Sequence, residues 1–159
     1  HIARFDESGV SFDYDWYAYT PGPAAEIINP FVMTSADQVT LLVDECYDVH
    51  NGGVIDCSEP YALITYEETT RKGLTVMQLR GMGQAPLVFA AALEDEPTKS
   101  DCETALAASS GIIIWPIDET KYYCYEYVPG MVGYSGWIRP TNFDSNGMTF
   151  DYLTWETSP

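Results

Sequence analysis

The stretch Tyr122-Tyr123-Cys124-Tyr125-Glu126-Tyr127-Val128 combines the two features that decide the fold of this chain. In an extended strand the odd-numbered positions face one side, so Tyr123, Tyr125 and Tyr127 form an aromatic stripe. Aromatic and β-branched residues are enriched in strands. Cys124 lies in the middle of the stripe and is one of four cysteines in the chain. The stretch therefore predicts a β fold that disulfides hold together.

The four cysteines form two couples that are close in sequence, Cys46 with Cys57 and Cys102 with Cys124. Neither couple has the Cys-x2-Cys spacing that zinc sites use, which favours disulfides over a metal centre. Four cysteines allow three connectivities. We predict the two sequence-local pairs, because each closes a turn-rich loop. Paired cysteines in a chain that begins at His1 rather than Met predict an exported protein, extracellular or periplasmic.

Other short apolar or alternating segments predict strands along the chain, with Gly and Pro turns between them. These segments are 10–16, 39–43, 61–66, 73–79, 87–93, 112–115, 136–138 and 148–155. One helix is expected near 101–109, where Ser100 and Glu103 have the spacing of a capping box and Ala-rich sequence follows. We expect a single extracellular domain over 1–159. Its fold class is all-β: an antiparallel β-sandwich or barrel of about nine short strands, one short helix and two disulfides.

The chain is strongly acidic, with 24 Asp and Glu against 7 Lys and Arg and a formal charge of −17. This balance argues against binding to nucleic acid or to an anionic membrane surface, because both recruit Lys and Arg. No apolar run reaches the ~20 residues that a membrane helix needs. The expected partners are therefore a protein or a carbohydrate at the cell exterior, and self-association is an open alternative.

Two metal sites are candidates, although no cofactor is required by the sequence. Asp144, Asn146 and Asp151 surround Gly147 and offer the oxygen ligands of a calcium loop, but the EF-hand spacing is absent and an Asx turn needs no ion. A free amino-terminal His1 with His50 resembles the histidine brace of lytic polysaccharide monooxygenases, which implies copper. Processing of the amino terminus explains His1 more simply.

The aromatic residues Tyr123, Tyr125, Tyr127, Tyr134 and Trp137 form the candidate binding face. If this face is exposed, it suits sugar rings or a protein partner; if it is buried, it is core. The sequence signals for catalysis are weaker than those for binding. There is no Gly-x-Ser-x-Gly elbow, and with only two His and with bridged cysteines there are few candidate residues for a Ser or Cys triad. Carboxylate pairs for glycoside hydrolysis stay open among so many acids.

Residues 102–155 also resemble a β module of bacterial secreted proteins and kinase ectodomains. The similarity lies in Tyr123-Cys124, in the spacing from Cys124 to Gly130, in the apolar strand at Trp137-Ile138 and in a closing strand that ends at Trp155. Tyr127 and Met131 replace the Thr and Arg of that module. The resemblance implies an extracytoplasmic β domain whose cysteine pairs with an upstream cysteine, and it carries over no catalytic residue.

The function that follows is a non-catalytic extracellular binding or assembly domain. The alternatives are a secreted carbohydrate-active enzyme, with or without a metal, and a subunit of a surface fibre or coat.

Overall fold

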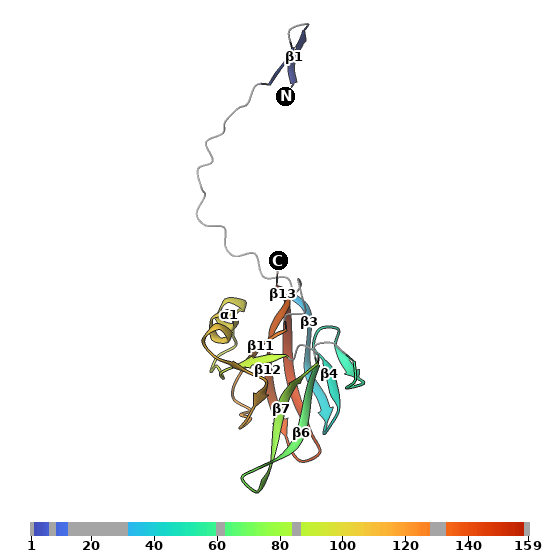
Figure 1. The fold of residues 1–159 in the computed structure, drawn as a ribbon, viewed down its shortest axis with the longest axis vertical. Helices are drawn as coiled ribbons and strands as arrows, with labels where there is room; N and C mark the ends of the chain where they lie inside the picture. The colour runs from blue at the N-terminus through green and yellow to red at the C-terminus, as the bar shows by residue number, and fades with distance from the viewer. Residues whose placement is uncertain are drawn as a thin grey trace.

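A computed structural model of the chain describes residues 2–6, 9–12, 32–59, 63–83, 87–127 and 133–157. Near the amino terminus, β1 (Ile2–Asp6) and β2 (Gly9–Phe12) form a two-stranded antiparallel sheet. The other strands form two larger antiparallel sheets, neither of them closed into a barrel (Figure 1). The fold is therefore all-β with one short helix, as the sequence predicts.

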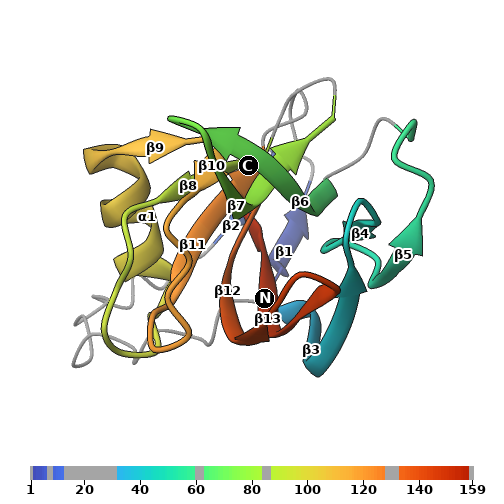
Figure 2. The ribbon, with the colours of Figure 1, turned by 90° about the horizontal axis from the view of Figure 1, so that it is seen from below.

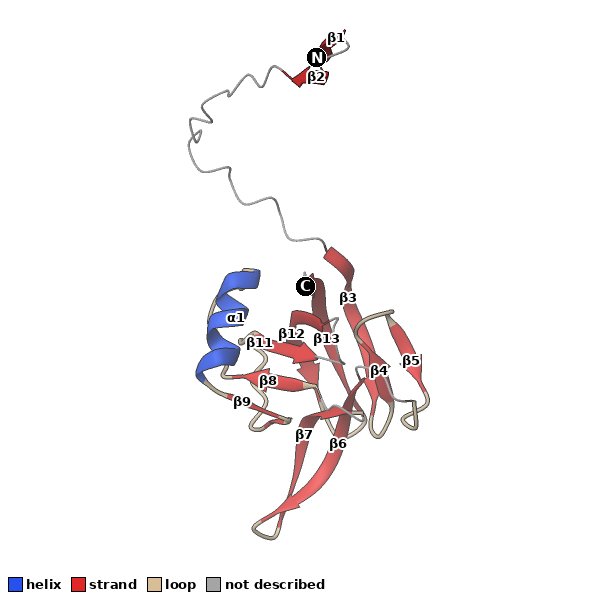
Figure 3. Cartoon of the chain, turned by 45° about the horizontal axis from the view of Figure 1, so that its top comes forward, coloured by secondary structure: helices blue, strands red, loops and turns tan. Residues whose placement is uncertain are grey.

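The five-stranded sheet has the order β10-β7-β6-β4-β5. Its strands are β4 (Cys46–Asp48), β5 (Gly53–Ile55), β6 (Leu63–Arg71), β7 (Leu74–Met82) and β10 (Ile113–Ile114). The six-stranded sheet has the order β3-β13-β12-β11-β8-β9. Its strands are β3 (Val32–Leu42), β8 (Val88–Ala90), β9 (Ser110–Gly111), β11 (Tyr123–Tyr127), β12 (Gly133–Phe143) and β13 (Gly147–Thr157). The helix α1 (Lys99–Ala108) lies beside β8, β9 and β11 (Figures 2 and 3).

The main core lies between the two sheets, because each strand turns alternate side chains toward the other sheet. In the six-stranded sheet the odd positions of β11 face this core, together with their register partners on β12 and β13. The largest fully buried side chains in the core are Leu41, Ile64, Tyr66, Leu79, Phe89, Tyr125, Ile138 and Phe150. The aromatic stripe thus points inward, toward the five-stranded sheet.

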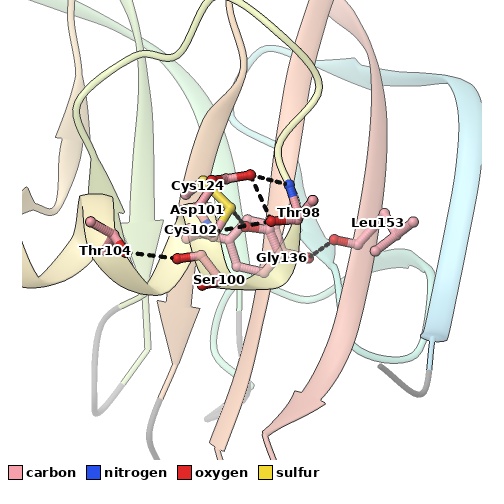
Figure 4. The surroundings of a disulfide bond; sticks show 9 residues. Thr98, Ser100, Asp101, Cys102, Thr104, Cys124, Gly136 and Leu153 are labelled. Atoms are coloured by element: carbon pink, nitrogen blue, oxygen red, sulfur yellow. Dashed lines mark hydrogen bonds between the residues drawn. A yellow bond between two sulfur atoms is a disulfide. The ribbon is translucent and has the colours of Figure 1, made fainter. Parts of the chain in front are cut away.

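A second core lies on the opposite face of the six-stranded sheet, under α1. Cys102 and Leu106 of the helix pack there against Cys124, Trp137 and Trp155. The Cys102–Cys124 bridge connects the helix to β11 in the middle of this layer (Figure 4). Both sulfur-bearing residues are 0% exposed. The molecule therefore has three layers: five-stranded sheet, six-stranded sheet and helix.

The helix confirms the sequence prediction in type and place, but it begins earlier than predicted. The capping residue is Thr98 rather than Ser100: the Thr98 hydroxyl accepts from Asp101 N, and Asp101 Oδ2 accepts from Thr98 N at 2.9 Å (Figure 4). Asp101 takes the third helical position, the role that the sequence prediction gave to Glu103. Its carboxylate is shorter than that of glutamate, but it still reaches the free backbone N–H of the cap. Among the described residues, no helix is long and apolar enough to cross a membrane.

Both predicted disulfides, Cys46–Cys57 and Cys102–Cys124, are present. The loop between Cys46 and Cys57 differs from the prediction, since it contains the antiparallel hairpin β4–β5 rather than only turns. Its turn is built by Asp48, which is 3% exposed and accepts from His50 N, Asn51 N and Asn51 Nδ2. Gly52 has φ +73°, a conformation that glycine adopts without strain.

The first and last residues of the strands differ most from the prediction in segments that neither alternate apolar and polar residues nor are uniformly apolar. Strands β3 and β12 each extend over 11 residues, well beyond the predicted 39–43 and 136–138. Pairing with β13 explains this, because β13 gives each strand a continuous partner. The predicted strand 87–93 is reduced to Val88–Ala90, with Leu93 bridging to Tyr122 alone.

Candidate functional site

The predicted aromatic binding face is core in this structure. Tyr123, Tyr125, Tyr127 and Trp137 are all less than 9% exposed, and Tyr134 is half-buried. Alternation also divides the set, since the three stripe tyrosines face the five-stranded sheet and Trp137 faces α1. The residues therefore do not form one surface, and the buried alternative of the sequence interpretation describes them.

A chain of hydroxyl groups explains how these buried tyrosines are satisfied. Tyr125 Oη lies 2.5 Å from Thr154 Oγ1, and Thr154 Oγ1 donates to the Val49 carbonyl. Tyr47 Oη donates to Tyr152 Oη at 3.4 Å in the same layer. Desolvation raises the pKa of Tyr47 and of Tyr125 well above the ordinary tyrosine value. The hydroxyls are therefore neutral structural groups that connect the two sheets.

Two of the calcium candidates, Asp144 and Asn146, lie in one turn, whereas Asp151 lies elsewhere on β13. Asp144 accepts from Asn146 N, Gly147 N and Asn146 Nδ2, which is an Asx turn between β12 and β13. Asp151 lies farther along β13 and accepts from Gln38 N of β3 at 2.8 Å. Within the described residues there is no group of three or more His, Cys, Asp and Glu side chains that could hold a metal ion.

Of the two copper candidates, the structure describes only the surroundings of His50, because His1 lies outside the described residues. His50 follows the Asp48 turn and stacks on Tyr134, with ring centroids 3.9 Å apart. Its Nδ1 is buried and has no hydrogen-bond partner among the described residues. The structure thus gives His50 a packing contact.

Asp144 gives the first testable prediction. The backbone hydrogen bonds from Asn146 and Gly147 lower the pKa of its carboxyl below 3.8. A carboxyl with a lowered pKa stabilises the fold above its unfolded pKa, and this contribution is lost as the pH falls through the lower folded-state pKa. Asp144→Ala should therefore lower the melting temperature at neutral pH, and the difference from wild type should disappear as the pH falls through the lowered pKa of Asp144. Thermal melts across pH measure this.

The control for this prediction is Asp95→Ala, a change at an exposed position. It should leave the melting temperature nearly unchanged at every pH. Calcium and magnesium at ~1 mM should act alike on the wild-type protein, as screening ions do. If calcium but not magnesium raised the melting temperature, and Asp144→Ala removed that rise, the turn would instead be a calcium site.

Three large apolar side chains that are close together in the chain are exposed at the edge of the five-stranded sheet. Ile112, Ile113 and Trp115 are 36%, 37% and 47% exposed. Ile113 and Ile114 form β10, paired with Arg80 and Leu79 of β7. Because neighbours on a strand face opposite sides, Ile114 enters the core and Ile113 points outward. We call Ile113, Trp115 and the pocket that they line the Trp115 face.

The pocket of the Trp115 face has a volume of about 350 Å³. Its walls are small or apolar at Ala90–Ala92 and at Ile113–Pro116, with polar groups at one end. The polar residues are Asp118, Lys121 and Tyr123. A shallow apolar pocket with an aromatic rim is typical of a binding site for a bulky side chain or a ring.

The polar groups of this pocket are already bonded within the chain. The Asp118 carboxylate accepts from the hydroxyl and the N–H of Thr120, and these bonds lower its pKa. Lys121 forms an ion pair with Glu94, whose hydrogen bond raises the pKa of the lysine. Tyr123 Oη accepts from Asp118 N, and desolvation raises the pKa of this tyrosine. Each polar side chain of the pocket therefore has at least one partner within the chain.

A bonded row of charged and polar residues runs along the outer side of the five-stranded sheet to Trp115. The Arg71 guanidinium lies 4.8 Å from the Trp115 ring centroid, and its Nη2 donates to Gln78 Oε1. Gln78 donates to Glu67, and Glu67 pairs with Arg80 at 3.6 Å. This row holds Arg71 against the indole, where a cation over the aromatic face is attracted.

The sequence pattern predicted a strand at Ile112–Trp115 but not its exposure. Four consecutive large apolar residues favour a fully buried strand. The signal against burial was Pro116 directly after Trp115, since proline ends strand pairing and is found at sheet edges.

No family model, curated protein or solved structure matches this chain.

Proposed function

We propose that this chain is an extracellular, non-catalytic binding domain, and that the Trp115 face receives an acidic segment of a partner protein with a large apolar side chain. The observation that carries the proposal is the exposure of Trp115 beside a pocket with apolar walls. Tryptophan is enriched among the side chains that contribute most to interface energies. Large exposed apolar groups that lie together mark interaction sites more often than scattered ones.

Charge supports an acidic partner. Arg71, Lys72 and Arg80 are three of the seven Lys and Arg residues in a chain of net charge −17. All three belong to the β6–β7 hairpin that adjoins the Trp115 face. Complementary charge speeds encounter and selects among partners. Three of the few positive charges of the protein thus lie on the hairpin next to Trp115, the most exposed tryptophan among the described residues.

The apolar lining of the pocket supports a protein rather than a carbohydrate. Sugar recognition depends on many polar side chains that bond to hydroxyl groups, whereas most of the lining, Ala90–Ala92 and Ile113–Pro116, is apolar. An apolar side chain requires only shape and desolvation. The two disulfides are consistent with folding in an oxidising compartment, and export to the cell exterior is part of the proposal. The resemblance of residues 102–155 to a module of secreted bacterial proteins supports the same location.

Binding to arrayed ligands tests this function. The purified protein is screened against an array of synthetic peptides that combine Asp and Glu with Trp, Phe or Leu, and against a glycan array. We expect peptide hits that weaken at ~0.5 M salt, because salt screens the charges. For the best peptide, Trp115→Ala should raise the Kd by about 30-fold or more, the loss expected when a hot-spot tryptophan is truncated.

The matched control is Val54→Ala. Val54 is 52% exposed in β5, at the opposite edge of the five-stranded sheet from β10. This variant should bind as wild type does. Hits on glycans alone, turnover of a substrate, or equal losses for Trp115→Ala and Val54→Ala would each contradict the proposed function.

A further inference from the structure

A second pocket, of about 390 Å³, lies between α1 and the face of the six-stranded sheet that the helix covers. Its lining is Glu103, Leu106 and Ala107 from the helix, Glu126 from β11 and Ser135 from β12. Glu126 and Ser135 are register partners, so their side chains lie next to each other on the same face. No residue of this pocket belongs to the Trp115 face.

The hydroxyl group of Ser135 is the unusual feature of this pocket. Ser135 is 1% exposed, yet its Oγ has no hydrogen-bond partner among the described residues. Buried hydroxyls are nearly always bonded, and an unmade bond costs free energy. A bound molecule that donates to Ser135 Oγ would remove this cost.

The charge of the pocket defines the kind of molecule. Both ionisable side chains that line it are carboxylates, and no Lys or Arg lines it. Glu103 is exposed and Glu126 is half-buried, so both carboxylates border solvent. The whole chain carries a net charge of −17, which adds to the attraction for a cation.

An organic cation fits this lining better than a metal ion. Calcium takes about 6–8 oxygen ligands, and two carboxylates with one hydroxyl supply too few. A primary ammonium group carries three N–H donors, and the pocket offers Glu103, Glu126 and Ser135 as three acceptors. Leu106 and Ala107 form an apolar wall that an alkyl chain can lie along. We propose that this pocket binds a primary alkylammonium group, carried by a lysine side chain or by a free diamine.

Titration of the intact protein with defined amines tests the proposal. The probes are Nα-acetyl-lysine methylamide for the protein source and 1,5-diaminopentane for the free source. Amide chemical shifts in 15N-labelled protein should change in a saturable way at Ser135, Ala107 and Glu126. Whichever probe binds more tightly identifies the source. The norleucine analogue, which has the stem without the charge, should not bind.

Three variants separate this site from general attraction to an acidic surface. Glu126→Gln keeps the shape and should weaken binding by about tenfold, since a charge-assisted bond becomes neutral. Ser135→Ala should also weaken binding while leaving thermal stability equal or higher, because the hydroxyl is unpaired without ligand. Glu119→Gln, at an exposed position outside the pocket, is the control and should bind as wild type does.

Three outcomes would overturn the proposal. The first is the absence of saturable binding by either amine. The second is equal weakening by Glu119→Gln and Glu126→Gln, which would mean non-specific attraction. The third is binding of calcium at these amides with no response to the amines. None of these outcomes bears on peptide binding at the Trp115 face, so the two proposals fail independently.

Discussion

Gly136→Ala should destabilise the protein by about 3–5 kcal/mol, the sum expected for overpacking a core and disrupting its buried hydrogen bonds. A Cβ atom at this position would lie 2.5 Å from Tyr125 Oη and even closer to the Leu153 carbonyl oxygen of β13. Gly136 pairs with Tyr125 on one side and with Thr154 on the other, so neither neighbour can move without opening the sheet. Denaturant unfolding measures the loss.

The matched control for this change is Gly111→Ala. Gly111 is exposed in β9, and a Cβ there would meet nothing within 4 Å. Its effect should stay within about 0.5 kcal/mol. Similar unfolding midpoints for the two variants would show that the close approach of Tyr125 and β13 to Gly136 does not constrain the fold.

Removal of the bridge between α1 and β11 is the second large effect. The double change Cys102→Ala with Cys124→Ala should cost about 3–5 kcal/mol. The bridge spans 22 residues, and its loss restores freedom to the unfolded chain. It also leaves space among Leu106, Trp137 and Trp155 in the second core. Denaturant unfolding gives the size of the loss, and hydrogen exchange should show that α1 loses protection before the sheets do.

The other disulfide supplies the comparison for this experiment. Cys46–Cys57 spans 11 residues and Cys57 is exposed, so replacing both residues by alanine should cost only about 2–3 kcal/mol. The exchange of α1 should be unaffected. Equal losses for the two pairs, or unchanged protection of α1, would mean that the helix is held by its apolar contacts alone.

Several features of this fold could be predicted from residues that are close in sequence. The two disulfides join cysteines that their own loops bring together. The helix near 101–109 follows from a capping pattern and Ala-rich sequence, although the cap was displaced from Ser100 to Thr98 because Thr98 and Asp101 bond each other reciprocally. The turn before Gly147 follows from Asp144 and Asn146, whose side chains bond the local backbone.

The candidate site could not be predicted in the same way. Alternation in β11 places Tyr123, Tyr125 and Tyr127 on one face, but it does not say whether that face meets solvent or another sheet. The five-stranded sheet covers it, and residues far along the chain such as Ile64 and Tyr66 belong to the same core. Trp115 is the opposite case. The apolar run 112–115 is typical of a buried strand, yet it lies at a sheet edge and Trp115 is exposed.

The sequence by itself therefore determined the β class, the two bridges, the helix and the local turns, because each depends on groups within a few residues or within one short loop. The tertiary structure alone decided which aromatic side chains are buried and which are exposed. It also decided that Glu103, Glu126 and Ser135 line one pocket, although they come from three separate elements. The physical reason is that burial and site assembly depend on contacts between strands distant in sequence, and periodicity carries no information about which partner covers a given face.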